Sequence, residues 1–135
     1  MFMELTIATG KQNELIDITS QINRAIPQNL KCGICLIHCP HTTAGLTVNE
    51  NADPDVKHDL LAKLDTLIPY HENYYRHGEG NSAAHLKSSL MGVSLTLPVV
   101  NGRLRLGVWQ GVYFCEFDGP RTRRVELFFQ DARPE

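Results

Sequence analysis

The stretch Val93-Ser94-Leu95-Thr96-Leu97-Pro98-Val99-Val100-Asn101-Gly102-Arg103-Leu104 sets the architecture of the chain. Asn101-Gly102 between two strand-like runs is the strongest short-range signal for a two-residue β-hairpin. The runs on either side extend over residues 93–100 and 103–109. Because a hairpin joins antiparallel strands, the pattern predicts antiparallel β-structure in this half of the chain.

The C-terminal segment repeats the pattern. The turn residues Asp118-Gly119-Pro120 separate two more strand-like runs, which predicts a second hairpin with strands at 112–117 and 121–130. In such a hairpin Glu116 would lie opposite Arg121 or Arg123 on one face. Two interpretations remain open. One is an exposed cross-strand ion pair, and the other is a guanidinium pair held by a carboxylate to bind phosphate oxygens.

Upstream of the hairpins, strands and helices are predicted to be mixed. Strands are expected at Phe2–Thr9, Lys31–Cys39 and Leu46–Glu50, and Glu14–Ile18 also fits a strand. The continuous apolar run within 31–39 favours a strand that is covered on both faces. Helices are expected from Thr19 or Ser20 to Ile26, from Asp53 to about Pro69, and from Ser82 to Leu90, the last one ended by Gly92.

A glycine-rich loop precedes the last of these helices. In His77-Gly78-Glu79-Gly80-Asn81-Ser82-Ala83-Ala84-His85-Leu86-Lys87, the two glycines allow a tight turn and Asn81 is expected to be the N-cap. A helix start favours an anion, because its first N–H groups lack partners. A capped surface helix with two unrelated histidines is the alternative.

Three histidines stand at the ends of predicted elements: His41, His77 and His85. His41, Thr42 and Thr43 follow the strand that ends at Cys39, where functional groups are common. Three imidazoles on zinc leave one position open for water or for a substrate oxygen. The spacing matches no short metal motif, so the residues alone suggest a metal site without requiring one.

The composition restricts the possible functions. A chain of 135 residues with a formal net charge of −2 is one domain (1–135) without the basic surface that nucleic-acid binding requires. No apolar run approaches the roughly 20 residues of a transmembrane helix, and no signal peptide is recognised, so we expect a cytoplasmic protein. Cys32 and Cys35 would point to opposite faces of a strand, and we therefore expect reduced thiols instead of a metal cluster.

Five motifs in order resemble the YjbQ-type family, also called secondary thiamine-phosphate synthases. They are His41-Thr42-Thr43-Ala44-Gly45-Leu46-Thr47-Val48-Asn49-Glu50, Asp59-Leu60, Gly80-Asn81-Ser82-Ala83-Ala84-His85-Leu86-Lys87, Gly107-Val108-Trp109-Gln110 and Glu116-Phe117-Asp118-Gly119-Pro120-Arg121-Thr122-Arg123. The resemblance implies an α+β fold of antiparallel, sandwich-like sheets with two to three packed helices. It also implies a homotrimer with sites near the subunit boundaries, and a divalent metal at His41, His77 and His85. Three imidazoles favour zinc, whereas diphosphate chemistry favours magnesium.

The activity that the resemblance implies joins a pyrimidine-methyl diphosphate to a thiazole phosphate and releases diphosphate. The metal, the helix start at Asn81, Lys87, and Arg121 with Arg123 are candidates to stabilise the departing anion. Glu50 or Asp59 is expected to orient a histidine or to move a proton. Candidate substrate-binding residues are Thr42, Thr43, Glu116, Trp109 for ring stacking and Gln110 for the ring edge.

Two other functions are compatible with the same residues. A metal-dependent hydrolase of a small phosphorylated compound would use the three histidines and a carboxylate. A non-catalytic metal- or anion-binding protein would use the same residues without turnover. Each of the three functions predicts a small-molecule ligand and neither a nucleic acid nor a membrane as partner.

Overall fold

The computed structural model describes residues 1–132 and has eight strands and three helices in that part of the chain. The strands are β1 (Phe2–Ala8), β2 (Glu14–Asp17), β3 (Cys32–His38), β4 (Ala44–Glu50), β5 (Ser94–Val100), β6 (Arg103–Leu104), β7 (Gln110–Glu116) and β8 (Thr122–Asp131). The helices are α1 (Thr19–Ala25), α2 (Pro54–Leu67) and α3 (Ser82–Met91). This composition confirms the α+β class.

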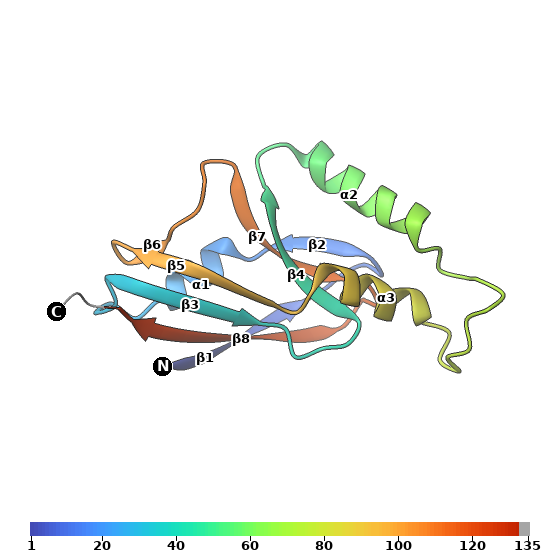
Figure 1. Ribbon diagram of the computed structural model, residues 1–135, viewed down its shortest axis with the longest axis horizontal. Coiled ribbons are helices and arrows are strands. Elements are labelled where there is room, and N and C mark those ends of the chain that lie inside the picture. The colour runs from blue at the N-terminus through green and yellow to red at the C-terminus, as the bar shows by residue number, and fades with distance from the viewer. Residues whose placement is uncertain (133–135) are drawn as a thin grey trace.

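All strand pairs are antiparallel and form two sheets. The five-stranded sheet has the order β1-β8-β3-β5-β6, and the three-stranded sheet has the order β2-β7-β4. Figure 1 shows α2 and α3 on the side of the smaller sheet, away from the larger one. The arrangement is a sandwich with a helical layer, as expected.

Two apolar clusters hold these layers together. The larger cluster lies between the sheets and includes Ile37 and Val125 of one sheet, Leu46 and Phe114 of the other, and Ile22 of α1. The smaller cluster packs the helices on the three-stranded sheet through Leu15, Leu64, Ala84, Tyr113, Cys115 and Phe117. The three-stranded sheet is therefore covered on both faces, which fits the unbroken buried run from Gly111 to Glu116 in β7.

The first predicted hairpin is present, but its second strand is short. Asn101 and Gly102 have φ angles of 54° and 77°, the positive values that a type I′ turn needs at both central residues. Only Arg103 and Leu104 pair with β5. The segment 105–109, which was predicted to continue the strand, is a loop that carries the chain to the other sheet.

The second predicted hairpin is wrong. β7 pairs with β2 and β4, whereas β8 pairs with β1 and β3. The turn at 118–121 therefore passes from one sheet to the other. Strand patterns and turn residues predict a reversal of direction, but they do not distinguish a hairpin from a crossing between packed sheets.

β3 alternates between exposed and buried residues, so the expectation that both of its faces are covered is wrong within one chain. Cys35 and Ile37 point into the core, while Ile34 and Leu36 remain 39% and 36% exposed. Phe128 of the adjacent strand is 44% exposed beside them. We call Ile34, Leu36 and Phe128 the outer sheet face.

The four cysteines, all within the described residues, are free thiols. Cys32 is exposed and Cys35 is buried, which confirms that they point to opposite faces of β3. Within residues 1–132 no helix combines the length and apolar character needed to cross a bilayer.

Candidate functional site

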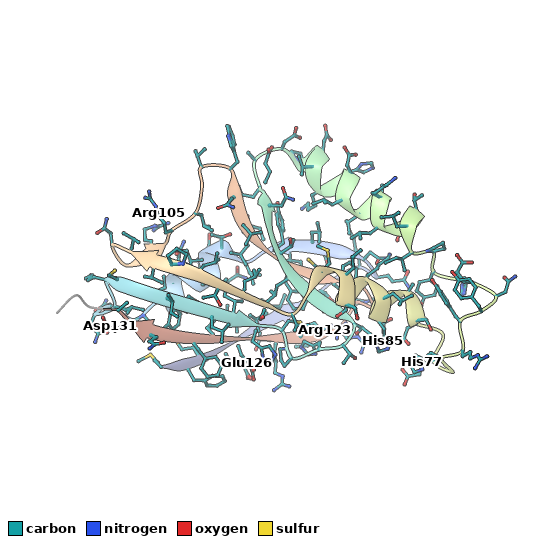
Figure 2. All side chains as sticks on the ribbon, viewed as in Figure 1. His77, His85, Arg105, Arg123, Glu126 and Asp131 are labelled. Carbon is teal, nitrogen blue, oxygen red and sulfur yellow. The ribbon has the colours of Figure 1, made fainter. Side chains whose placement is uncertain are left out.

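A polar cavity of about 430 Å³ lies where several elements end or begin: after β3, before β4, before α3, and between β7 and β8. It is lined by Pro40, His41, Thr42, Thr43, His77, Glu79, Asn81, His85, Asp118, Arg121 and Arg123. Figure 2 shows His77, His85 and Arg123 gathered toward the same end of the molecule. The fold thus brings all three predicted metal-ligand histidines to one cavity.

His41 lies in the loop between β3 and β4 and is fixed by the neighbouring strand. Its Nε2 accepts a hydrogen bond from the backbone N–H of Arg124 at 2.9 Å. Burial and the nearby Arg123 charge lower the pKa of His41 below its ordinary value. The ring is therefore neutral at pH 7, and with Nε2 accepting, its proton is on Nδ1.

His77 and His85 face each other across the start of α3. Their ring centroids are 5.1 Å apart and their planes meet at 79°. The loop between them turns at Gly80, whose φ of 75° lies in the left-handed region that favours glycine, and the Gly80 N–H donates to the His77 carbonyl at 3.1 Å. This turn carries His77 back over the first turn of the helix.

Asn81 occupies the N-cap position of α3, as predicted, but its side chain does not cap the helix. Its Nδ2 donates to Asp118 Oδ2 at 2.8 Å. Its Oδ1 is buried and has no hydrogen-bond partner among residues 1–132. A buried acceptor without a donor is costly, so this oxygen indicates a missing ligand, ion or water at the cavity.

Asp118 links the helix start to Arg121. Arg121 donates through Nη2 to Asp118 Oδ2 at 3.1 Å and through Nε to the Asp118 carbonyl at 2.9 Å. The Arg121 side chain is half exposed. It therefore has a defined position, and its remaining donors can reach a ligand in the cavity.

Glu116 and Arg123 form a buried ion pair beneath the cavity. The two side chains are 0% and 4% exposed, and Arg123 Nε donates to Glu116 Oε1 at 2.8 Å. The interpretation as an exposed cross-strand pair is therefore wrong, because the two residues lie on strands of different sheets and their side chains meet in the interior. Arg123 Nη2 also donates to Thr43 Oγ1 at 2.8 Å, whereas Nη1 has no hydrogen bond to residues 1–132.

The Glu116 carboxylate is fully engaged in this network. Oε1 also accepts from the Thr9 hydroxyl at 2.8 Å, and Oε2 accepts from the Asp118 N–H at 3.0 Å. Burial by itself raises the pKa of Glu116, but the hydrogen bonds from Arg123, Asp118 and Thr9 outweigh it and the pKa is lowered. Glu116 is therefore ionised and compensates the charge of Arg123.

Among residues 1–132, no group of three His, Cys, Asp or Glu side chains is arranged to hold a metal ion. At His41 the hydrogen bond from Arg124 opposes coordination. A neutral imidazole that accepts at Nε2 has no lone pair left at Nδ1 for a metal. His77 and His85 make no hydrogen bond to the described residues, so their nitrogens are available.

The structure does not bring Glu50, Trp109 and Gln110 to the polar cavity. Ala44 pairs with Glu116 at the cavity end of β4, whereas Glu50 pairs with Gln110 at the other end. Six residue steps along a strand separate these ends by about 20 Å. Trp109 is 61% exposed in the adjoining loop. Within one chain these residues belong to a different surface.

Asp59 and Lys87 also lie outside the cavity. Asp59 is on α2, highly exposed, and paired with His58 at 3.0 Å. Lys87 is buried, bonded to Asp65 and to Asn13 Oδ1, with its ammonium 5.8 Å from the Phe117 ring centroid. Its position indicates a role in fixing α3 on the sheet.

Sequence reasoning missed two acidic residues of the cavity, Glu79 and Asp118. The available signals were the glycines around Glu79, which expose its side chain, and the turn that contains Asp118. Both residues were assigned only to turns.

Comparisons with known proteins identify the family and agree with the fold. Residues 3–132 match the family model described as UPF0047 protein YjbQ-like. The chain is 55% identical over 124 residues to UPF0047 protein YugU of Bacillus subtilis, covering 91% of this chain and 94% of the relative. It is 53% identical over 124 residues to UPF0047 protein MJ1081 of Methanocaldococcus jannaschii, covering 91% of this chain and 89% of that relative.

Solved structures give the same result. A crystal structure of an uncharacterised YjbQ/UPF0047-family protein from Clostridium acetobutylicum superimposes with a TM-score of 0.91 at 47% identity, covering 95% of this chain and 99% of that chain. The conserved hypothetical protein TT1486 of Thermus thermophilus gives 0.90 at 46%, with the same coverage. The family-model match, the sequence identity to the relatives and the shared fold together show that this chain belongs to the UPF0047 (YjbQ-like) family.

Proposed function

We propose that the chain is a metal-dependent enzyme acting on a small phosphorylated compound in the polar cavity, with transfer of the thiamine-phosphate-synthase type as its reaction. A pyrimidine-methyl diphosphate would be joined to a thiazole phosphate with release of diphosphate. The observation that carries the proposal is the cavity, which combines three imidazoles, the donors of two arginines and the unpartnered Oδ1 of Asn81.

The residues of the cavity suit a divalent metal in kind. His77 and His85 have available nitrogens, and the buried Asn81 oxygen lacks a donor or a cation among residues 1–132. His41 would have to give up the N–H of Arg124 before it could join them. When bound, a divalent ion would polarise a phosphate oxygen and stabilise the charge of the leaving group. Imidazole ligands favour zinc, whereas phosphate oxygens of a substrate favour magnesium.

The arginines provide the donors for phosphate. Arg121 projects from the turn before β8, and Arg123 is held from below by Glu116 and Thr43 so that Nη1 remains available. Glu116 compensates the Arg123 charge and Asp118 compensates the Arg121 charge, so the two arginines offer directed N–H donors to an anion instead of an excess of positive charge. The start of α3 adds the partial positive charge of its first N–H groups.

The direct test supplies both thiamine precursors with zinc or magnesium and measures release of diphosphate. His77→Ala and Arg121→Ala should each lower the rate by at least about tenfold, since each removes a stabilising group. His58→Ala, an exposed histidine on α2, is the matched control and should retain activity. Absence of thiamine phosphate with wild-type protein would reject the synthase assignment.

A hydrolase is the second candidate, and Glu79 favours it. This exposed carboxylate lines the same cavity and makes no bond to residues 1–132, so it can serve as a general base for water. A panel of single phosphoesters separates the candidates. Turnover of one ester without a second substrate, abolished by Glu79→Gln, supports hydrolysis.

We also propose a cytoplasmic homotrimer. The four free thiols support a reducing compartment. The outer sheet face exposes Ile34, Leu36 and Phe128 side by side, and such an apolar patch is typical of a protein interface. A second copy of the chain is the partner that these residues suit.

A further inference from the structure

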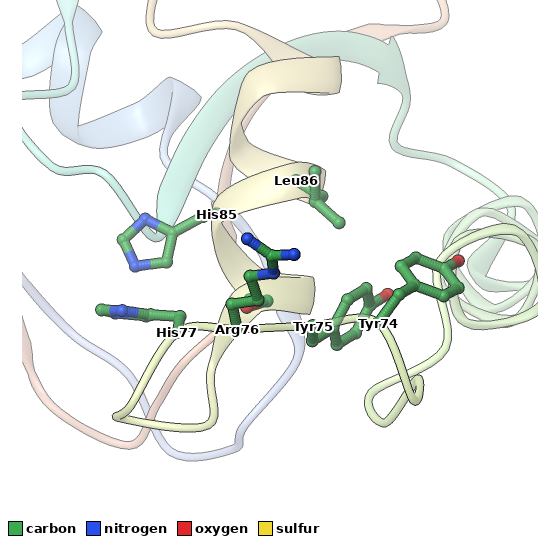
Figure 3. Close-up of a pocket in the computed structure, with 7 residues that line it drawn as sticks. Tyr74, Tyr75, Arg76, His77, His85 and Leu86 are labelled. Carbon is green, nitrogen blue, oxygen red and sulfur yellow. The ribbon is translucent and has the colours of Figure 1, made fainter.

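A second cavity of about 550 Å³ adjoins the polar cavity and shares His77 and His85 with it. Its other lining residues are Tyr74, Tyr75, Arg76, Ser82 and Leu86. We call it the tyrosine cavity. Figure 3 shows the two histidine rings on one side of the start of α3, the two tyrosines on the other side, and Arg76 between them.

Tyr75 is held in place by its own hydroxyl. The hydroxyl donates to the Pro69 carbonyl at 2.8 Å, and the Tyr75 N–H donates to the Glu72 carbonyl at 3.1 Å. The ring of Tyr74 meets it edge to face, with centroids 5.4 Å apart at 82°. The cavity thus has an aromatic wall, on which Tyr74 is 73% exposed. Exposed aromatic rings are suited to stacking on a flat ligand.

Arg76 gives the same cavity an unpaired charge. Its guanidinium makes no hydrogen bond or ion pair with residues 1–132. In Figure 3 it projects between His85 and Leu86. A free guanidinium beside aromatic rings has the donors to bind a phosphate or another anion.

We propose that the tyrosine cavity binds the flat heteroaromatic ring of a phosphorylated substrate, with the ring against Tyr74, Tyr75 and Leu86 and its anionic group at Arg76. The inference rests on the proposed function in assuming that His77 and His85 act on the ligand that the tyrosines hold. Its volume lies within the range of about 300–1,000 Å³ typical of small-molecule sites. It also assigns to the tyrosines the ring contact that was predicted for Trp109, which lies on another surface within one chain.

Calorimetric titration with phenyl phosphate and with inorganic phosphate tests this assignment without requiring turnover. Wild-type protein should bind phenyl phosphate about tenfold more tightly than phosphate, because a stacked ring adds affinity of that order. Tyr74→Ala should remove most of this preference and leave phosphate binding unchanged. Arg76→Gln should weaken phenyl phosphate several-fold. Tyr70→Ala changes an aromatic residue of the same loop that does not line the cavity, and it should behave as wild type.

Equal affinity for the two probes, binding of neither, or an unchanged preference in Tyr74→Ala overturns the ring site. If Tyr74→Ala abolishes self-association of the protein but does not change its affinity for phenyl phosphate, the ring site is overturned and Tyr74 belongs to a subunit contact. The outcome is separable from the proposed function. If the ring probe binds as predicted but no diphosphate is released from the thiamine precursors, only the synthase assignment is rejected. If diphosphate release is the same in Tyr74→Ala as in wild type, only the ring site is rejected.

Discussion

At the scale of single residues, the fold buries an ion pair in its interior and places the neutral ring of His41 at the cavity. His41 illustrates the second point, since burial and Arg123 both disfavour its protonated form. The pKa of His41 in the folded chain therefore lies below that in the unfolded chain. Because the unfolded chain takes up this proton first as the pH falls, His41 lowers stability progressively below about pH 6.5.

An NMR titration of the imidazole protons checks this prediction. The His41 resonance, assigned by its absence in His41→Gln, should have a midpoint below 6.5. In urea unfolding, His41→Gln should lose less stability between pH 7.5 and pH 5 than the wild type. A His41 midpoint at or above 6.5 is incompatible with the described environment.

Breaking the Glu116–Arg123 pair should lower the free energy of unfolding strongly. Glu116→Gln leaves the buried Arg123 charge uncompensated, which typically costs about 3–5 kcal/mol in the free energy of unfolding. Glu4→Gln breaks the exposed pair with Arg124, at 3.4 Å, and should cost less than about 1 kcal/mol. Urea denaturation of the two variants gives the comparison, and similar losses would show that burial of the first pair is unimportant.

At the scale of elements, the loop before α3 sets the histidine geometry through one glycine. Gly80 has a φ of 75°, whereas Gly78 has no positive φ, and a Cβ added at either position meets no atom within 4 Å. Backbone conformation is therefore the main difference between the two sites. Gly80→Ala should lower the free energy of unfolding by about 1 kcal/mol, and Gly78→Ala should have little effect. Equal effects in thermal unfolding would contradict the role of Gly80.

Local patterns predicted the strands and helices well, but the caps only in part, since the Asn81 side chain does not cap α3. Asp53 caps α2 through the Asp55 N–H at 2.9 Å, Gly92 ends α3, and Asn101-Gly102 forms its turn. These features depend on neighbours within a few residues. The second hairpin failed because the choice between pairing with the next strand and crossing to the other sheet depends on the whole core.

The candidate site was predictable in part for the same reason. His41, His77 and His85 follow or begin elements whose ends the sequence indicates, and all three reach one cavity. Glu50 and Gln110 also lie in recognised motifs, but β4 and β7 place them at the far end of their strands. A motif records which residues occur together, whereas the strand register decides which of them meet.

At the scale of the whole molecule, the outer sheet face leaves three large apolar side chains partly exposed in a single chain. Light scattering during size-exclusion chromatography should give a mass of three times the 15.2 kDa chain. Leu36→Glu places a charge on the outer sheet face and should yield monomers, because burying an unpaired charge is costly. Leu67→Glu alters a residue of α2 that is 60% exposed and should leave the trimer intact. A monomeric wild type contradicts the assembly.

The central claim is that His77 and His85, with His41, hold a divalent metal at the polar cavity. Elemental analysis of untagged protein, after equilibration with zinc, tests it most directly. Wild type and a His58→Ala/His71→Ala control should retain about one zinc per chain, whereas His77→Ala/His85→Ala should retain almost none, because two of three imidazole ligands are gone. Equal zinc content in the three proteins would contradict the claim.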